Sequence, residues 1–123
     1  MVNLWKETLD ILEKSNKSWD DVLYISNIKK SQHYKDESLV FEIPKNEFEE
    51  VTKTINYDNG FGGNEINIQL KIVGNGWWLE RCEYDGSEWW SYKELPKKPD
   101  MELSQVKALL IDFSPNLYVL EAE

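Results

Sequence analysis

Two groups of residues carry side chains whose types could do chemistry. Asp58, Glu80 and Arg81 combine two carboxylates with a guanidinium, a set that a small hydrolase or transferase could use for acid–base chemistry and substrate binding. Cys82 and the only histidine, His33, could nominally form a thiolate–imidazole pair, but one residue of each kind carries no spacing signal. Neither group defines an active site, so we expect no catalytic residues.

A glycine-rich segment, Tyr57–Asn64, is the other place where a ligand could bind. Asp58, Asn64 and Glu65 are oxygen-bearing residues near glycines, but the spacing of a calcium loop is absent. The run Gly60–Gly63 lacks the lysine and the serine or threonine of a phosphate-binding loop. We therefore expect no metal and no cofactor, and we treat the segment as a candidate binding loop with three residues of interest: Tyr57, Asp58 and Phe61.

The elements that position these residues follow from two turn dipeptides, Asn75-Gly76 and Asp85-Gly86. Both are typical of two-residue hairpin loops, which favour positive φ at their two central residues. The runs beside them are rich in aromatic and β-branched residues and include four of the six tryptophans. The segment Glu65–Leu95 is therefore predicted to form a three-stranded antiparallel meander. Two-residue loops fix its register as Tyr84 opposite Ser87, Cys82 opposite Trp89, Arg81 opposite Trp90, Leu79 opposite Tyr92, Val73 opposite Trp78, Ile72 opposite Leu79 and Lys71 opposite Glu80.

This register divides the meander into two faces, because side chains alternate along a strand. The predicted core face holds Ile66, Ile68, Leu70, Ile72, Trp77, Leu79, Trp90 and Tyr92. Arg81 lies on the same face, where we expect it to stack on Trp90 and to pair with Glu83 or Glu88. The opposite face holds Val73, Trp78, Cys82, Tyr84, Trp89 and Leu95 among Lys71, Glu80, Ser91 and Lys93.

The second face is the candidate binding surface, made of Trp78, Glu80, Tyr84, Trp89, Ser91 and Lys93. An exposed aromatic patch with a polar rim is typical of a surface that contacts a partner. The partner could be another protein or a second copy of this chain, and a sugar stacked on Trp78 or Trp89 is the small-molecule alternative. Equally open is a structural interpretation, in which Trp5, Trp19 or the C-terminal segment covers these side chains as a second small core.

The rest of the chain supplies helices and further strands. Asn3 is predicted to cap a helix over Leu4–Glu13, and Asn46 a second helix reaching Ile55 with Phe48, Val51, Thr52 and Ile55 on its buried side. Ser18–Asp21 has the form of a capping box. Strands are expected at Val22–Ile25, Leu39–Ile43 and Ile66–Val73, and a polar loop at Asn27–Glu37. A C-terminal helix is expected over Met101–Asp112, followed by a closing strand or an extended tail at Asn116–Leu120.

These elements predict an α+β domain, with two to three helices packed mainly on one face of an antiparallel sheet. Residues 1–99 form the predicted domain, and residues 100–123 are an extension packed on it. At 123 residues the chain is long enough for a core without disulfides. A single cysteine and an N-terminus without a signal peptide or membrane span make the cytoplasm the expected compartment.

The net charge of −9 argues against binding the phosphates of nucleic acid, which requires clustered lysine and arginine. An acidic chain could instead imitate nucleic acid and inhibit a DNA-binding protein. The acidic residues are scattered, however, and their densest group, Glu47, Glu49 and Glu50, is flanked by Lys45 and Lys53. This pattern favours a solvated helix face over mimicry.

One resemblance is carried by the segments YDNGFG at Tyr57–Gly62, IVG at Ile72–Gly74 and WWLERCEYDGSEWW at Trp77–Trp90, and by LWKETL at Leu4–Leu9 and SWDDV at Ser18–Val22. Together they resemble a family of small proteins from phages and prophages of Gram-positive bacteria. Cys82 stands where relatives are expected to have histidine, which argues against a catalytic role at that position. The resemblance implies a phage-associated context and no particular activity. We therefore expect a non-enzymatic binding protein, with the small enzyme and the acidic mimic as alternatives.

Overall fold

A computed structural model describes residues 1–30 and 38–102 of the chain. The elements, in order, are β1 (Val2–Asn3), α1 (Leu4–Lys14), a 3-10 turn (Trp19–Asp21), β2 (Val22–Lys30), β3 (Ser38–Ile43), α2 (Lys45–Thr52), β4 (Asn56–Tyr57), β5 (Lys71–Gly74), β6 (Trp77–Tyr84) and β7 (Ser87–Glu94). Three sequence predictions concern residues outside these ranges: His33, the strand or tail at Asn116–Leu120, and all but the first two residues of the C-terminal helix. No helix within the described ranges is long and apolar enough to cross a membrane.

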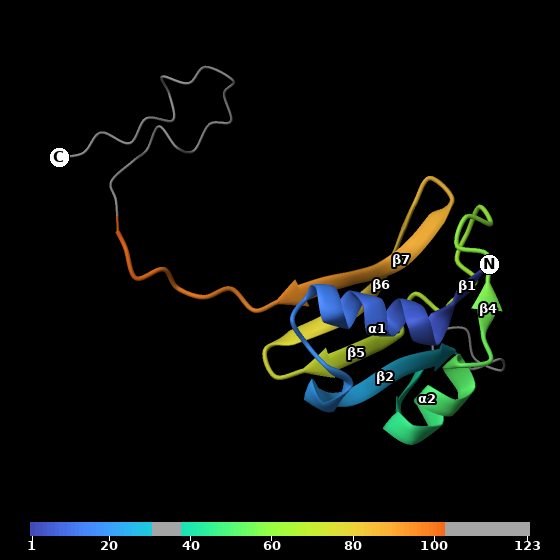
Figure 1. Cartoon of the computed structure of the whole chain (residues 1–123), viewed down its shortest axis with the longest axis horizontal. Helices are drawn as coiled ribbons and strands as arrows, with labels where there is room; N and C mark the ends of the chain where they lie inside the picture. Colours follow the sequence, from blue (N-terminus) through green and yellow to red (C-terminus); the bar gives the residue numbers. More distant parts are fainter. Residues whose placement is uncertain (31–37, 103–123) are drawn as a thin grey trace, which may run out of the picture.

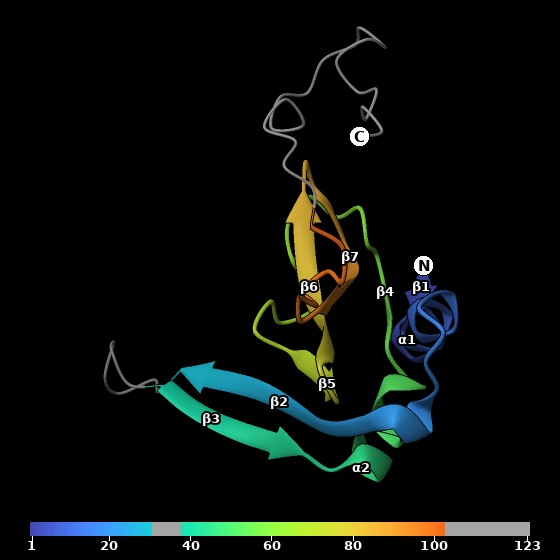
Figure 2. The ribbon, with the colours of Figure 1, turned by 90° about the vertical axis from the view of Figure 1, so that its left-hand side faces the viewer.

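The main sheet has five antiparallel strands in the order β3-β2-β5-β6-β7, and β1 pairs with β4 in a small second sheet. Helix α1 runs along one face of the β5–β7 part, nearest to β7, while α2 lies beside β2 and β3 (Figure 1). The β2–β3 hairpin turns away from the other strands and projects from the body of the domain on the side opposite α1 (Figure 2). The predicted α+β class with an antiparallel sheet is confirmed.

The register predicted from the two turn dipeptides is confirmed at every pair named above. Asp85 and Gly86 both have positive φ, as expected for a two-residue hairpin loop, whereas in the Asn75-Gly76 loop Gly76 has positive φ and Asn75 does not. Gly74, before the first loop, has a different reason to lack a side chain. The Trp77 indole lies directly over its Cα, in the space that a Cβ would occupy.

The core lies between the helices and the inner face of the sheet. Asn3 caps α1 as expected, its side chain accepting a hydrogen bond from the Lys6 N–H. The apolar side of that helix meets a group of buried side chains that comes from every main-sheet strand except β3: Val22, Ile25, Ile72, Trp77, Leu79 and Trp90. Three further rings close the end of the core, with Trp5 edge-on to Trp19 and Trp19 stacked on Phe48.

The prediction of a strand over Ile66–Val73 is wrong for Ile66–Leu70, because β5 begins only at Lys71. Residues 66–70 form turns in which side chains take the place of a strand ladder. The Asn67 carboxamide accepts from the Gln69 N–H and donates to the Ile28 carbonyl, and the Leu70 N–H donates to the Asn67 carbonyl. Ile68, expected in the core, is consequently half exposed.

Two other boundaries differ from the prediction. The residues Asn27–Lys30, expected in a loop, continue β2 because the strongly strand-forming β3 pairs with them. The second helix begins at Lys45, and Asn46 does not cap it; the carbonyl of Pro44 accepts the Phe48 N–H instead. The helix ends at Thr52, whereas the prediction extended it to Ile55. Phe48 and Thr52 are buried as expected, but Val51 is half exposed.

Candidate functional site

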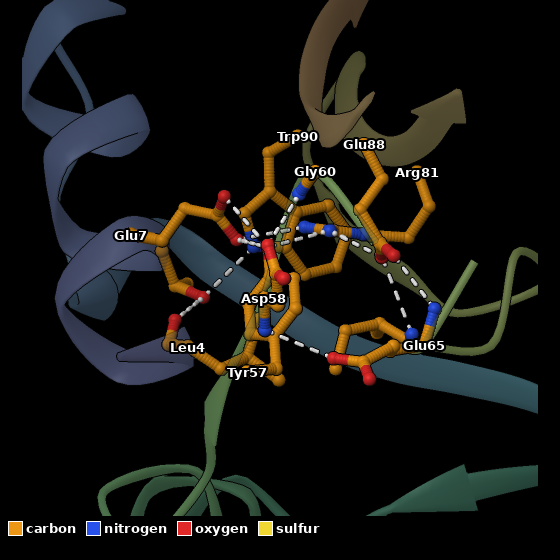
Figure 3. A network of polar contacts seen from close by, with 11 residues as sticks. Leu4, Glu7, Tyr57, Asp58, Gly60, Glu65, Arg81, Glu88 and Trp90 are labelled. Carbon is orange, nitrogen blue, oxygen red and sulfur yellow. Dashed lines mark hydrogen bonds and ion pairs between the residues drawn. The ribbon is translucent and has the colours of Figure 1, made fainter. Parts of the chain in front are cut away.

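The inner face of the sheet contains a buried cluster of charged and polar groups around Arg81 (Figure 3). One guanidinium nitrogen donates to a Glu7 carboxylate oxygen at 2.8 Å. The other donates to the Glu88 carboxylate at 3.0 Å and to the Tyr57 hydroxyl at 2.8 Å. The same hydroxyl donates to Glu7 at 2.7 Å, so the cluster joins α1, β4, β6 and β7.

Glu88 connects this cluster to the loop that crosses the end of the sheet. Its carboxylate is fully buried and accepts the backbone N–H groups of Glu65 at 2.6 Å and Ile66 at 3.2 Å. Its own N–H donates to the Asn59 carbonyl at 2.8 Å. A buried carboxylate with one guanidinium and two backbone donors is well compensated, so Glu88 fixes both ends of the 59–66 loop.

Trp90 stacks against the guanidinium and completes the cluster. The Arg81 Cζ lies 4.8 Å from the indole centroid, and the indole N–H donates to the Thr8 hydroxyl at 3.0 Å. The expected stacking of Arg81 on Trp90 is therefore present, and its acidic partner on the strand is Glu88, not Glu83. Arg81 Nε is buried without a hydrogen-bond partner among the described residues. The arrangement cross-links α1 to the sheet and leaves no open space for a substrate at the guanidinium.

Two groups of the cluster have shifted pKa values. Burial and the hydrogen bond to Glu7 raise the pKa of the Tyr57 hydroxyl well above its ordinary value of 10.0, although the Arg81 charge opposes the change. Burial disfavours the charged form of Arg81, but its hydrogen bonds to Tyr57 and Glu7 and the Glu7 charge outweigh this effect and raise its pKa. Arg81 is thus a permanent cation, and Tyr57 a permanent hydrogen-bond donor at neutral pH.

The raised pKa of Tyr57 predicts a loss of stability in alkali. Because the pKa is higher in the folded than in the unfolded state, the stabilisation is complete below about pH 10 and is lost as the pH rises further. Tyr57→Phe should cost about 1–3 kcal/mol at neutral pH by leaving its two partners short of a hydrogen bond. The variant should also lose less of its free energy of unfolding than the wild type as the pH rises above 10. Urea unfolding at a series of pH values between neutral and pH 11 would measure this difference. A decline as steep as in the wild type would show that another group causes it.

The residues of the possible enzyme site are not brought together. Glu80 and Arg81 are neighbours on β6 and point to opposite faces of the sheet, with Arg81 buried. Asp58 lies in the exposed loop, where its carboxylate accepts the Gly60 N–H at 2.9 Å. The two grooves beside the helices have volumes of about 310 Å³ and 370 Å³, and none of these three residues lines either groove. Asp58, Glu80 and Arg81 therefore do not form a common site in this structure.

The glycine-rich loop has a structural role in the described structure. Tyr57 is buried in β4 as part of the cluster, while Asp58 and Phe61 are exposed. Glu65, the third possible calcium ligand, accepts the Asp58 N–H at 2.9 Å. No group of three histidine, cysteine, aspartate or glutamate side chains within residues 1–30 and 38–102 could hold a metal ion.

The opposite face of β5–β7 carries the candidate binding surface. Tyr84 is 76% exposed and Trp89 is 41% exposed, while Trp78, Glu80 and Ser91 are half-buried. Trp5 and Trp19 pack with Phe48 at the helices, so neither covers this face. Within the described part of the chain, the six candidate residues thus share one aromatic face with polar and charged neighbours. The possibility that residues 103–123 cover it lies outside the described residues.

Sequence reasoning missed two contributors to the cluster, Glu7 and Thr8. Both lie in the first half of α1. Nothing in the sequence around Glu7 distinguishes it from the other acidic residues of this helix. A weak signal was available. Thr8 lies at helical spacing among the apolar residues of α1 that are buried, Leu4, Trp5 and Leu12. A buried hydroxyl requires partners, and Thr8 has them in the Leu4 carbonyl and the Trp90 indole.

The fold and its surfaces define an α+β domain with an antiparallel sheet, one face of which is covered by helices. Compared with known proteins, the chain matches no protein-family model, no curated protein and no solved structure.

Proposed function

We propose that this protein is a non-enzymatic binding protein that contacts a partner protein through the outer face of β5–β7. The observation that carries the proposal is the difference between the two faces of one sheet. The inner face buries Trp77, Leu79 and Trp90 beneath the helices, whereas the outer face leaves Tyr84 and Trp89 substantially exposed.

The composition of the outer face supports a protein partner. Aromatic side chains supply large apolar contact areas, and burying one gives roughly 1.5–3 kcal/mol. Cross-strand neighbours provide a polar and charged rim, in which Trp78 lies opposite Lys93 and Glu80 lies between Lys71 and Ser91. Such rims set orientation and specificity more than affinity.

The proposed setting is the cytoplasm of a bacterium that carries a phage or prophage. The support for the phage context is the sequence resemblance at Trp77–Trp90. The support for the compartment is the single cysteine, Cys82, which has no disulfide partner in the chain.

The test is capture from a bacterial lysate by the wild-type chain and by the double variant Trp78→Ser/Trp89→Ser. The proposal expects at least one protein that the wild type captures and the variant does not, because two central aromatic contacts commonly dominate binding energy. Circular dichroism would establish that the double variant is folded.

The matched control is Val51→Ser/Phe61→Ser, which removes two exposed apolar side chains from α2 and the 59–66 loop. This control should keep the captured protein. A folded double tryptophan variant that captures the same proteins as the wild type contradicts the proposal. Unfolding of that variant would instead show that the two tryptophans belong to a core.

A further inference from the structure

Strand β7 forms one edge of the five-stranded sheet (Figure 1). Its pairing with β6 across a two-residue loop makes Tyr84 and Ser87 a hydrogen-bonded pair, and such pairs recur at every second residue of an antiparallel ladder. Ser91 and Lys93 therefore direct their backbone groups toward β6. The backbone groups of Trp90, Tyr92 and Glu94 point outward, to the side where no described strand lies.

Two hydrogen bonds confirm this alternation and limit the free edge at one end. The Leu95 N–H donates to the Gly76 carbonyl, on the β6 side. The Glu88 N–H donates to the Asn59 carbonyl, on the outer side, so the 59–66 loop already occupies the edge there. At the other end, Pro96 has no N–H to donate. The free edge is thus a short window from Trp90 to Glu94, in which no described residue accepts the outward N–H groups.

This window is self-complementary. Its central residue is Tyr92, and an antiparallel copy centred there would pair Tyr92 with Tyr92 of the second copy and Trp90 with Glu94. In this register Glu88 of one copy lies opposite Pro96 of the other. Neither position has a free N–H to pair, because the Glu88 N–H already donates to Asn59 and Pro96 has none. On the outer face of the sheet the same register sets Trp89 against Leu95, two apolar side chains that are exposed in the single chain.

The helix beside the edge also suits a second copy. A groove of about 370 Å³ lies between α1 and β7, lined by Trp89, Trp90 and a row of α1 side chains that includes Lys6, Asp10 and Lys14. A two-fold axis perpendicular to the sheet would bring the α1 helices of both copies together, antiparallel, on the same face. Positive and negative charges alternate one turn apart along this row, so an offset of one turn brings one lysine of each helix near Asp10 of the other.

From these observations we propose that the protein forms a two-fold symmetric dimer by antiparallel pairing of the Trp90–Glu94 edges of β7. The two sheets then join into one continuous ten-stranded sheet, and the outward backbone groups gain partners. This inference concerns the edge of the sheet and does not depend on the proposed function of its outer face.

The first test measures the mass of the full-length chain by analytical ultracentrifugation, together with Tyr92→Pro and Tyr92→Val. Proline removes the central N–H from an edge position where the fold tolerates it, and valine removes the ring but keeps the N–H. We expect a wild-type dimer, a dimer for Tyr92→Val, and a dissociation constant raised about tenfold or more for Tyr92→Pro. A monomeric wild type at tens of micromolar, or a dimer that Tyr92→Pro leaves unchanged, overturns the proposal.

The second test does not depend on how well the proline variant folds. In a Cys82→Ser background, Tyr92→Cys places two thiols on the two-fold axis, with Cα atoms about 5.5 Å apart in a hydrogen-bonded pair. A short bis-maleimide reagent should then link the two chains. Lys71→Cys in the same background is the control, because β5 lies two strands away from the edge and should not be linked. Equal linking of the two variants, or none at position 92, contradicts the proposed pairing.

Discussion

Arg81→Met is expected to lower the free energy of unfolding by about 3–5 kcal/mol, because it leaves buried carboxylates without their cation. Arg81 has no exposed side-chain area, and neither does its partner Glu88; Glu7 is only slightly exposed. Removing the guanidinium therefore leaves charge that water does not screen. Urea unfolding at neutral pH measures the loss, with the unfolding slope checked for a two-state transition.

The double variant Arg81→Met/Glu88→Gln separates charge from packing. Glutamine keeps a carbonyl oxygen for the backbone N–H groups that Glu88 binds, but it removes the uncompensated charge. We expect it to recover part of the loss caused by Arg81→Met alone. Lys93→Met, on the exposed outer face, should change stability by no more than about 0.5 kcal/mol. An Arg81→Met variant as stable as this control would contradict the described cluster.

Trp90→Ala is expected to cost about 3–5 kcal/mol, the range found for a buried aromatic side chain replaced by alanine. The indole fills the space between α1 and the sheet, covers the Arg81 guanidinium and donates to the Thr8 hydroxyl. Alanine would leave a cavity and would remove the hydrogen bond between Trp90 and Thr8, two residues that lie 82 positions apart in the sequence.

The neighbouring residue provides the control for this second prediction. Trp89→Ala removes the same side chain from the other face of the same strand, where the indole is 41% exposed. It should cost about 1 kcal/mol or less. Thermal unfolding of both variants measures the difference. Equal losses, or a larger loss for Trp89→Ala, would contradict the assignment of the two faces.

The assignment of faces was predictable from sequence because two short turns determine it. Asn75-Gly76 and Asp85-Gly86 each permit a tight hairpin loop, and a tight loop fixes which residues lie opposite each other over the whole ladder. The positions of Trp77, Leu79, Arg81 and Trp90 followed from that register, since a shift by one residue would have reversed them all.

Alternation alone was a poorer guide at Ile66–Leu70. The pattern there is that of a strand, but Asn67 and the buried Glu88 satisfy the backbone locally, and no ladder forms. The participation of Glu7 in the cluster could not be predicted either. It depends on how α1 docks against the sheet, which places Glu7 beside Arg81 of β6, 74 residues away in the sequence, and no local pattern encodes that contact.

The most direct test of the proposed binding face is an NMR titration of the isotopically labelled chain with the protein captured from lysate. The proposed function predicts that the largest shifts occur in the indole signals of Trp78 and Trp89 and the amides of Tyr84, Ser91 and Lys93. The buried indoles of Trp77 and Trp90 should change little. Shifts confined to the 59–66 loop or to α2, with the outer face of β5–β7 unchanged, would contradict it.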